Sequence, residues 1–557
     1  MDRSLVLIWV AVLLSVVGTL LSFSWNAILN FIIAKEMRLT PATKLYSAWQ
    51  KTPIPVMTEF YFFNWTNPEE LMNEDFKPNL VEMGPYTFKA FLEKTNITWN
   101  QNNTISFRKH RRWYFDPENS NGSLNDNVTT LNPVALAAAY VTRFRSSFIK
   151  FSLSGALRMT GQKVWITKTV GEFLFDGYSD PILAAAAFAA SLSQTNFRAS
   201  KFAWFYKRND SSDQEGVYNV ETGEEDVSKL GVVRSWNYKN HSEFFESDCG
   251  QVKGTIGDLY PPGQKKSTPL QLFTSEICRY VQVDYAEDTE VLGIPGYTYV
   301  GGNSVFDNGT SDPKNQCNCV GVCTPQGVLN VSSCRYGAPG FLSNPHFLDA
   351  DPYFRDKVNG MNPDRKKHQV YVTLEPTTGI PLDVAARLQV NLLLQPIESI
   401  SLYSGVPTIF FPVFWFEESV QITPELAKSL KMLLALPVVG TYVSFGILLL
   451  GLLIVVFVGG LKVIARLHRS LFRYWKGAAA ANGSAARGKG CCPLAALLTA
   501  APLNSAREKE ALSLKQITEE AKKSSNKVVL YDEKSCPLMS PITIVDGNSK
   551  MADITVK

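Results

Sequence analysis

The chain has 557 residues, and its 55 Lys and Arg nearly balance its 51 Asp and Glu, for a formal net charge of +4. A charge this small on a chain this long gives no indication of nucleic-acid binding. The sequence also contains no G-x-S-x-G, H-E-x-x-H, P-loop or dinucleotide-binding motif, and four of its five histidines are scattered between residues 110 and 368. We therefore expect that the protein is not an enzyme and that it binds no cofactor.

Two uncharged apolar runs, Leu5–Ile33 and Leu433–Leu461, frame the chain. A helix of either length rises ~43 Å, more than the ~30 Å of a bilayer's hydrocarbon core. The alternative for the first run is a cleaved signal peptide, with Ser22 and Ser24 imitating a cleavage site, but the apolar pattern continues past them. The alternative for the second run is a buried core helix, which would need a polar face that this run lacks. The sequence predicts a hairpin of two membrane-spanning helices.

The side on which each segment lies follows from charge and from glycosylation sequons. Basic residues follow the second run at Lys462, Arg466, Arg469, Arg473 and Lys476, which favours a cytoplasmic C-terminus. Nine Asn-x-Ser/Thr sequons lie between the two runs, which favours an extracellular or lumenal position for that region. They begin at Asn64, Asn96, Asn102, Asn121, Asn127, Asn209, Asn240, Asn308 and Asn330. The predicted order is a cytoplasmic N-terminus (1–4), a first span (5–33), an ectodomain (34–432), a second span (433–461) and a cytoplasmic tail (462–557).

Six of the nine cysteines lie close together in the ectodomain, between residues 249 and 334: Cys249, Cys278, Cys317, Cys319, Cys323 and Cys334. An even, clustered set in an oxidising compartment predicts three disulfides, with fifteen connectivities open. Zinc binding at Cys317, Cys319 and Cys323 is the alternative, but their spacing is not that of a usual zinc finger and no histidine stands beside them. We therefore expect disulfides and no metal.

After the first span, Thr40-Pro41 predicts the start of a short helix over Pro41–Gln50. Aromatic and β-branched residues then predict strands over Val56–Trp65, Thr87–Phe91 and Ile105–Phe115. The third strand has a basic centre, from Arg108 to Arg112, which is typical either of an anion site or of a solvated strand face.

Helical signals replace strand signals over residues 132–193. Asn132-Pro133 predicts a helix through about Lys150, Thr169-x-x-Glu172 is a capping box, and Asp180-Pro181 begins another helix. The charges of this predicted bundle are mostly basic, which favours either an anionic ligand or ordinary helix solvation. The candidate ligand-binding residues are Arg143, Arg145, Lys150, Arg158 and Lys163.

From Lys201 to Trp415, short strand-like runs alternate with turn signals, which predicts an antiparallel β-rich body and hence an α+β membrane protein. The runs are Ala203–Tyr206, Val281–Tyr285, Tyr297–Val300, Gln369–Leu374, Arg387–Leu394 and Thr408–Trp415. The tail is largely low-complexity and is expected to be disordered. In it, Cys491 and Cys492 are candidates for palmitoylation or are simple thiols, and residues 533–539 resemble an imperfect acidic dileucine sorting signal.

Several phrases of the ectodomain resemble the class B scavenger receptor family, which includes fatty acid translocase and lysosomal integral membrane protein type two. They include Phe60–Glu70, Glu82–Phe88, Arg111–Pro117, Thr169–Pro181, Glu375–Leu394 and Phe411–Glu417. The resemblance implies a large antiparallel β-barrel-like ectodomain with an apical helical bundle that receives ligands and a hydrophobic tunnel that carries lipid. It also implies the pairs Cys249–Cys317, Cys278–Cys334 and Cys319–Cys323. The family's functional apical lysine has no clean counterpart here, so only a basic apex is carried over.

The leading hypothesis is a scavenger receptor that binds lipid, fatty acid, sterol, lipoprotein or other polyanionic ligands at this apex. It would mediate lipid uptake or transfer and endocytosis at the plasma membrane, with cycling through endosomes or lysosomes. The alternatives are a trafficking receptor for a protein cargo of lysosomes and a cell-recognition or adhesion receptor. The sequence leaves the oligomeric state open.

Overall fold

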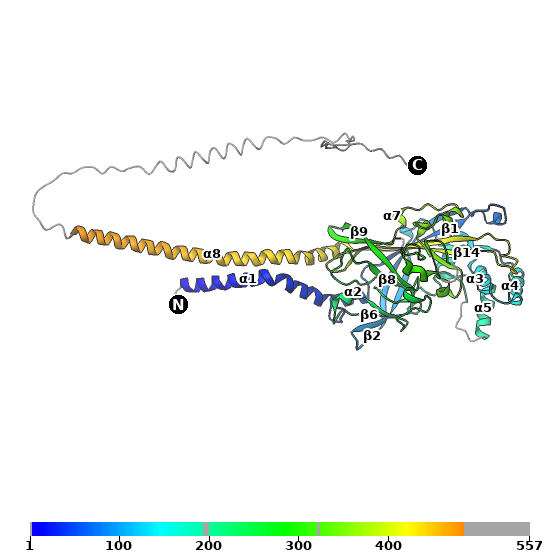
Figure 1. Ribbon diagram of the computed structural model, residues 1–557, viewed down its shortest axis with the longest axis horizontal. Helices are drawn as coiled ribbons and strands as arrows, with labels where there is room; N and C mark the ends of the chain where they lie inside the picture. Colours follow the sequence, from blue (N-terminus) through cyan, green and yellow to red (C-terminus); the bar gives the residue numbers. More distant parts are fainter. Residues whose placement is uncertain (1–2, 193–199, 303, 320–322, 484–557) are drawn as a thin grey trace, which may run out of the picture. The chain divides into compact units, whose positions relative to one another are not determined.

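The computed structural model describes residues 3–192, 200–302, 304–319 and 323–483. Residues up to Lys462 form one unit, and the chain from Val463 onward forms a second. The first unit contains a large antiparallel sheet, several short helices and two long apolar helices (Figure 1).

A 13-stranded antiparallel sheet makes up most of the first unit. Its main path runs in the order β7-β6-β3-β2-β1-β15-β14-β13-β10-β9-β8, while β12 pairs with β14 and with β11. The first and last strands of the chain, β1 and β15, are neighbours in the middle of this path. The strands are β1 (Val56–Trp65), β2 (Leu80–Trp99), β3 (Thr104–Phe115), β6 (Val217–Glu221), β7 (Val233–Trp236), β8 (Leu270–Thr274), β9 (Arg279–Val291), β10 (Ile294–Val300), β11 (Val328–Asn330), β12 (Gly340–Ser343), β13 (Tyr371–Leu374), β14 (Pro381–Leu394) and β15 (Ile409–Gln421).

One short segment, Gly254–Thr255, joins the two ends of this path. The N–H of Val233 in β7 donates to the carbonyl of Gly254 at 2.8 Å, and the N–H of Thr255 donates to the carbonyl of Gln271 in β8 at 2.9 Å. Gly254 has φ +85°, and a Cβ at this position would lie 2.2 Å from the Gln271 carbonyl oxygen, so glycine is required. The sheet is thereby almost closed, which confirms the expected barrel-like fold.

Most of the predicted strands lie within or overlap β1, β2, β3, β9, β10, β13, β14 and β15. The strand predicted at Ala203–Tyr206 is wrong. This segment instead lies against a five-residue π-helix, Glu172–Asp176. The N–H of Trp204 donates to the carbonyl of Phe173 in that helix at 2.8 Å. Its aromatic side chains made it resemble a strand, but they pack on that helix and on the sheet interior.

The helices of the first unit are α1 (Arg3–Glu36), α2 (Lys44–Gln50), α3 (Pro133–Thr142), α4 (Ser147–Met159), α5 (Pro181–Leu192), α6 (Pro352–Asp356), α7 (Arg365–His368) and the first part of α8 (Pro424–Gly483). Two predicted helices have wrong bounds. The helix α2 begins at Lys44 because Thr43, not Thr40, caps it by accepting the N–H of Tyr46. The helix predicted from Asn132 to Lys150 is interrupted between α3 and α4, where Ser146 adopts the extended backbone typical of a residue that precedes a helix.

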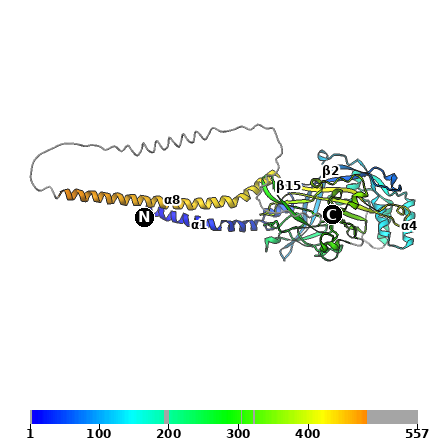
Figure 2. The same ribbon diagram turned by 45° about the horizontal axis from the view of Figure 1, so that its top comes forward.

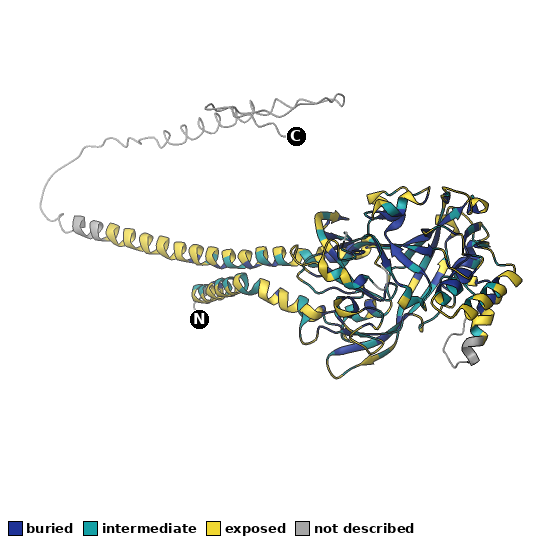
Figure 3. Ribbon diagram, turned by 45° about the vertical axis from the view of Figure 1, so that its right-hand side comes forward, coloured by how far each residue is buried: buried dark blue, intermediate teal, exposed yellow. Residues whose placement is uncertain are grey.

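The helices α1 and α8 are both long and apolar enough to cross a membrane, over Ser4–Glu36 and Pro424–Lys476. They lie side by side, and their side chains are mostly exposed, in contrast with the sheet (Figure 3). The indole N–H of Trp25 donates to the carbonyl of Leu436 at 3.1 Å. Close approach depends on glycine: a Cβ on Gly451 would lie 2.4 Å from the Ser15 hydroxyl. The hairpin of two apolar helices that the sequence predicts is therefore confirmed.

Candidate ligand-binding site

Three helices, α3, α4 and α5, gather at the end of the first unit that lies away from α1 and from the start of α8 (Figure 2). Each begins at a polar residue. The Asn132 side chain accepts the N–H of Ala135, and the Asp180 carboxylate accepts the N–H groups of Ile182 and Leu183. Before the π-helix, the capping box forms as predicted, with reciprocal bonds between Thr169 and Glu172. We call this end of the molecule, residues 132–192, the helical apex.

The helical apex presents aromatic side chains to solvent. Phe144, Phe148 and Phe151 are 85%, 79% and 76% exposed, and Met159 at the end of α4 is 89% exposed. Burying one such side chain stabilises a complex by ~1.5–3 kcal/mol, and an apolar patch of this kind is typical of an interaction site. The sequence analysis missed these residues because phenylalanines at spacings of four and three are ordinarily the buried face of a helix.

The five basic residues proposed from the sequence lie in the same segment. Arg145, Arg158 and Lys163 are exposed, whereas Arg143 and Lys150 are half-buried. The guanidinium of Arg143 lies 3.5 Å from the ring centroid of Tyr140 and donates to its carbonyl. Within the described part of the chain, none of the five forms an ion pair. The helical apex thus combines exposed aromatic rings with cations that have no carboxylate partner.

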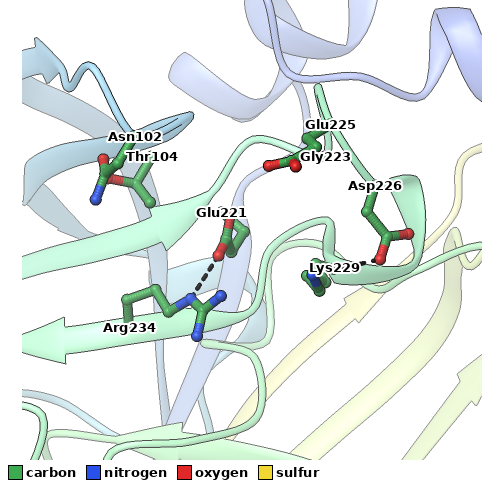
Figure 4. Close-up of a pocket in the computed structure, with 8 residues that line it drawn as sticks. All are labelled: Asn102, Thr104, Glu221, Gly223, Glu225, Asp226, Lys229 and Arg234. Carbon is green, nitrogen blue, oxygen red and sulfur yellow. Dashed lines mark hydrogen bonds and ion pairs between the residues drawn. The ribbon is translucent and has the colours of Figure 1, made fainter.

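Two surface pockets differ in character. One, with a volume of about 410 Å³, lies in the helical apex and is lined by Gln162, Lys163, Trp165, Lys168 and Tyr178 among others. The other, of about 380 Å³, includes the sequon residue Asn102 (Figure 4). Its acidic residues Glu221 and Asp226 are paired with Arg234 and Lys229. In the first pocket, Lys168 is paired with Glu172 and Asp180 is also part of the lining. Lys163 forms no ion pair among the described residues, so it is the cation there that suits an anionic ligand.

The basic run of β3 is not an anion site. Its side chains alternate between the two faces of the strand, and each one finds a carboxylate of the protein itself. Lys109 and Arg111 point inward, toward Asp258 and toward Glu215 and Glu418, whereas their neighbours pair on the outer face. The outer pairs are Arg108 with Asp213, His110 with Asp210 and Arg112 with Glu93.

These inward charges form a buried network. Burial disfavours the charged guanidinium of Arg111, yet Glu418 and Glu215 raise its pKa above the usual range. Burial likewise disfavours the Glu276 carboxylate, but Arg208 and Arg335 lower its pKa to about 2. Arg111 and Glu276 are therefore both charged at neutral pH. The ion pair of Arg111 with Glu418 joins β3 to β15.

Two of the four histidines between residues 110 and 368 stack on each other. The rings of His346 and His368 are 4.3 Å apart, and both residues are buried. The backbone N–H of Asn362 donates to Nδ1 of His346 at 3.0 Å, and that of Asp364 donates to Nδ1 of His368 at 2.9 Å. Burial, with His346 beside it, lowers the pKa of His368 to about 4. Nδ1 of each ring is therefore held as a hydrogen-bond acceptor.

Nε2 of His346 lies 2.7 Å from the Glu82 carboxylate, which also accepts the indole N–H of Trp415. Burial opposes ionisation of Glu82, but these hydrogen bonds lower its pKa. The histidine pair thus ties the segment Asn362–His368 to β2 and β15.

The structure joins Cys249 to Cys317, Cys278 to Cys334 and Cys319 to Cys323, the pairs that the family resemblance implies. Of the nine sequon asparagines, Asn64, Asn308 and Asn330 are half-buried and the other six are exposed. Glycosylation stays a prediction. Cys491, Cys492 and the sorting signal at 533–539 lie outside the described residues.

Comparison with known proteins gives the chain its family. The CD36 family matches residues 8–462. The chain is 36% identical to protein peste of Drosophila melanogaster over 443 residues, which are 78% of each chain. It is 33% identical to scavenger receptor class B member 1 of Cricetulus griseus over 485 residues, 84% of this chain and 92% of the relative. It is 34% identical to lysosome membrane protein 2 of Homo sapiens over 423 residues, 75% of this chain and 86% of the relative.

These matches cover both apolar helices and the sheet between them. They agree with a membrane protein of the plasma membrane or the lysosome membrane. The chain belongs to the CD36 family, alongside class B scavenger receptors.

Proposed function

We propose that this protein is a scavenger receptor whose helical apex binds the surface of lipid particles and passes lipid toward the membrane. The observation that carries the proposal is the set of three phenylalanines on and beside α4, more than three-quarters exposed, next to Arg145 and Arg158. Aromatic rings enter the acyl boundary of a lipid surface while arginines contact anionic headgroups. We propose binding and transfer rather than catalysis as the activity.

The route for lipid is the interior between the helical apex and the sheet. Phe60, Phe62, Phe173 and Phe414 lie together there, fully buried, in a continuous apolar core. An acyl chain gains ~0.8 kcal/mol for each buried CH2 group, so such a path is favourable for it. The rings fill the core in this structure, so passage of lipid requires them to move.

The orientation of the chain in the membrane is also part of this proposal. The body lies outside the cell or in a lumen, and both ends of the chain lie in the cytoplasm, because the nine sequons and the basic residues after the second span fall on opposite sides of it. Treatment of the extracted full-length protein with a glycosidase tests this order: a loss of mass is expected, because only a body on the extracellular or lumenal side receives N-glycans.

The test of the apex uses full-length protein in cells and liposomes that contain phosphatidylserine. Replacing Phe144, Phe148 and Phe151 by serine should reduce liposome binding at least tenfold, since even half-burial of three rings is worth more than ~1.4 kcal/mol. The matched control is Tyr238→Ser, which removes a ring that is 83% exposed outside the helical apex. Equal binding by the triple variant and the control would refute the proposal.

A second experiment tests the basic residues of the helical apex. It compares a double variant, Arg145→Gln with Arg158→Gln, with the control Lys357→Gln, which changes an exposed lysine outside the helical apex. Loss of binding that depends on phosphatidylserine only in the first variant supports the basic apex. The alternative function, a trafficking receptor for a protein cargo, is favoured by the similarity to lysosome membrane protein 2. It would be preferred if the variants lost no lipid uptake but failed to deliver a protein to lysosomes.

A further inference from the structure

The part of α8 that follows the membrane span is strongly two-sided. Five cations lie in Lys462–Lys476, and this stretch contains no Asp or Glu. At ~100° per residue, these five fall within an arc of roughly 80° on the helix. They are Lys462, Arg466, Arg469, Arg473 and Lys476.

The other half of the same helix is apolar apart from His468, and among the described residues it is exposed. Ile464, Leu467, Leu471 and Trp475 are 63%, 58%, 59% and 73% exposed, and Phe472 and Tyr474 extend the apolar half. Because the helix continues without a break through this stretch, the two faces are fixed opposite each other. An apolar half of this width in water is unfavourable, so something covers it.

We propose that Val463–Lys476 lies on the bilayer surface as an interfacial helix, its apolar half in the acyl boundary and its cations on anionic phospholipid headgroups. This stretch directly follows the uncharged run Leu433–Leu461, which is long enough to cross a bilayer, so the bilayer is the nearest apolar phase. Its composition, Lys and Arg on one face and Trp, Phe and Leu on the other, is that of helices that lie in the membrane interface. This inference is independent of the lipid-binding apex.

A second copy of the chain is the other way to cover the face, and the charges argue against it. Two copies packed side by side would bring ten cations together with no acidic residue in this stretch to offset them. The apolar half is also far wider than the narrow stripe on which a coiled coil packs. A pair of glycines, Gly459 and Gly460, precedes the stretch, and a Cβ on either would meet nothing within 4 Å. Such a pair is a common place for a helix to bend, here from the span onto the surface.

The test uses the full-length chain with Cys491, Cys492 and Cys536 changed to serine and one new cysteine, carrying a spin label. Leu471→Cys places the label on the apolar half, and the matched control Arg473→Cys places it on the basic face two residues later. Each protein is reconstituted into bilayers of phosphatidylcholine with phosphatidylserine. The label at 471 should be several-fold more accessible to oxygen than to a water-soluble nickel complex, and the label at 473 should show the reverse.

The charge requirement is tested with the label at 471. Its protection from the nickel complex should fall several-fold in pure phosphatidylcholine, and also when Arg466, Arg469 and Arg473 are all changed to glutamine. Equal access of the nickel complex at 471 and 473 would overturn the proposal, because the helix would then stand in water. Dipolar broadening between labels at 471 would also overturn it, in favour of a second copy. Unchanged protection without anionic lipid would refute the assignment of the headgroup.

Discussion

Protonation of His368 should weaken the attachment of the segment Asn362–His368 in mildly acidic conditions. Nδ1 of His368 accepts the backbone N–H of Asp364, and a protonated ring loses this bond because both of its nitrogens become donors. Burial is the main cause that disfavours a charged His368 ring. The neighbouring His346 and Arg387 on β14 also disfavour it, whereas Glu82 and Asp364 favour it. The net result is a pKa of about 4, against 6.5 for an ordinary histidine.

The direction of the pH effect on the attachment follows from the pKa of His368 in the closed segment, about 4, and in the open segment, 6.5. Between pH 6.5 and pH 4 the opened segment binds the proton and the closed segment does not, so stability falls as the pH falls through this window. The attachment is at full strength above pH 6.5. A drop from neutral pH to pH ~5 should cost about 2 kcal/mol, or ~30-fold in the equilibrium between closed and open segments.

Amide hydrogen exchange of the full-length protein in detergent measures this effect directly, because the amides of Asn362 and Asp364 are the donors to the two rings. Their protection, corrected for the intrinsic pH dependence of exchange, should fall ~30-fold from neutral pH to pH ~5. His368→Gln keeps an acceptor but cannot titrate, so its protection should change little. His110→Gln, on the outer face of β3, is the control. Parallel pH profiles for the wild-type protein and His368→Gln would refute the reasoning.

Three further changes test the architecture. Arg111→Met removes the cation that the buried Glu215 and the half-buried Glu418 share, and it should lower the free energy of unfolding by ~3–5 kcal/mol. Arg112→Met removes a more exposed ion pair on the same strand and should cost at most ~1 kcal/mol. Equal shifts in urea unfolding would contradict this. Gly451→Leu should separate the two apolar helices and lower the melting temperature in detergent by an overpacking cost of ~1–3 kcal/mol, while Gly446→Leu, where a Cβ meets nothing within 4 Å, should not. Replacing Cys249 by serine opens a loop of 68 residues and should cost about 4 kcal/mol, unless the unfolded chain is already compact there.

Local signals predicted the fold wherever one physical cause dominates. The two long apolar helices were predicted from their uncharged runs, because such a run is unfavourable in water. The Thr169–Glu172 capping box was predicted because its hydrogen bonds join residues close together in the sequence. The break between α3 and α4 was not predicted, because residues 142–146 contain no Gly or Pro, although Ser146 adopts an extended backbone before α4. The barrel-like fold was expected from the family resemblance, but the order of the strands was not predicted, because pairing and register depend on contacts between residues far apart in the chain.

Of the candidate site, only the basic residues were named from the sequence. A basic residue is expected at a surface, so the five cations were found from composition alone. The exposed phenylalanines beside them run against the usual pattern, and the rule that apolar residues face the core concealed them. The corresponding rule that charged residues face water failed for β3. Lys109 and Arg111 point inward there because they pair with carboxylates from distant segments of the chain.

The pairing of β1 with β15 sets a time order for biosynthesis. The strand β1 ends at Trp65 and its partner begins at Ile409, so about 340 residues must be made before the two can meet. At ~5–20 residues per second, synthesis of that stretch takes roughly 20 to 70 s. During this time β1 has one unpaired edge of aromatic residues, a template for mispairing with other chains. The sheet can close only when the ribosome has nearly reached α8, so the yield of the protein in cells should depend on chaperones that cover β1 until β15 has been synthesised.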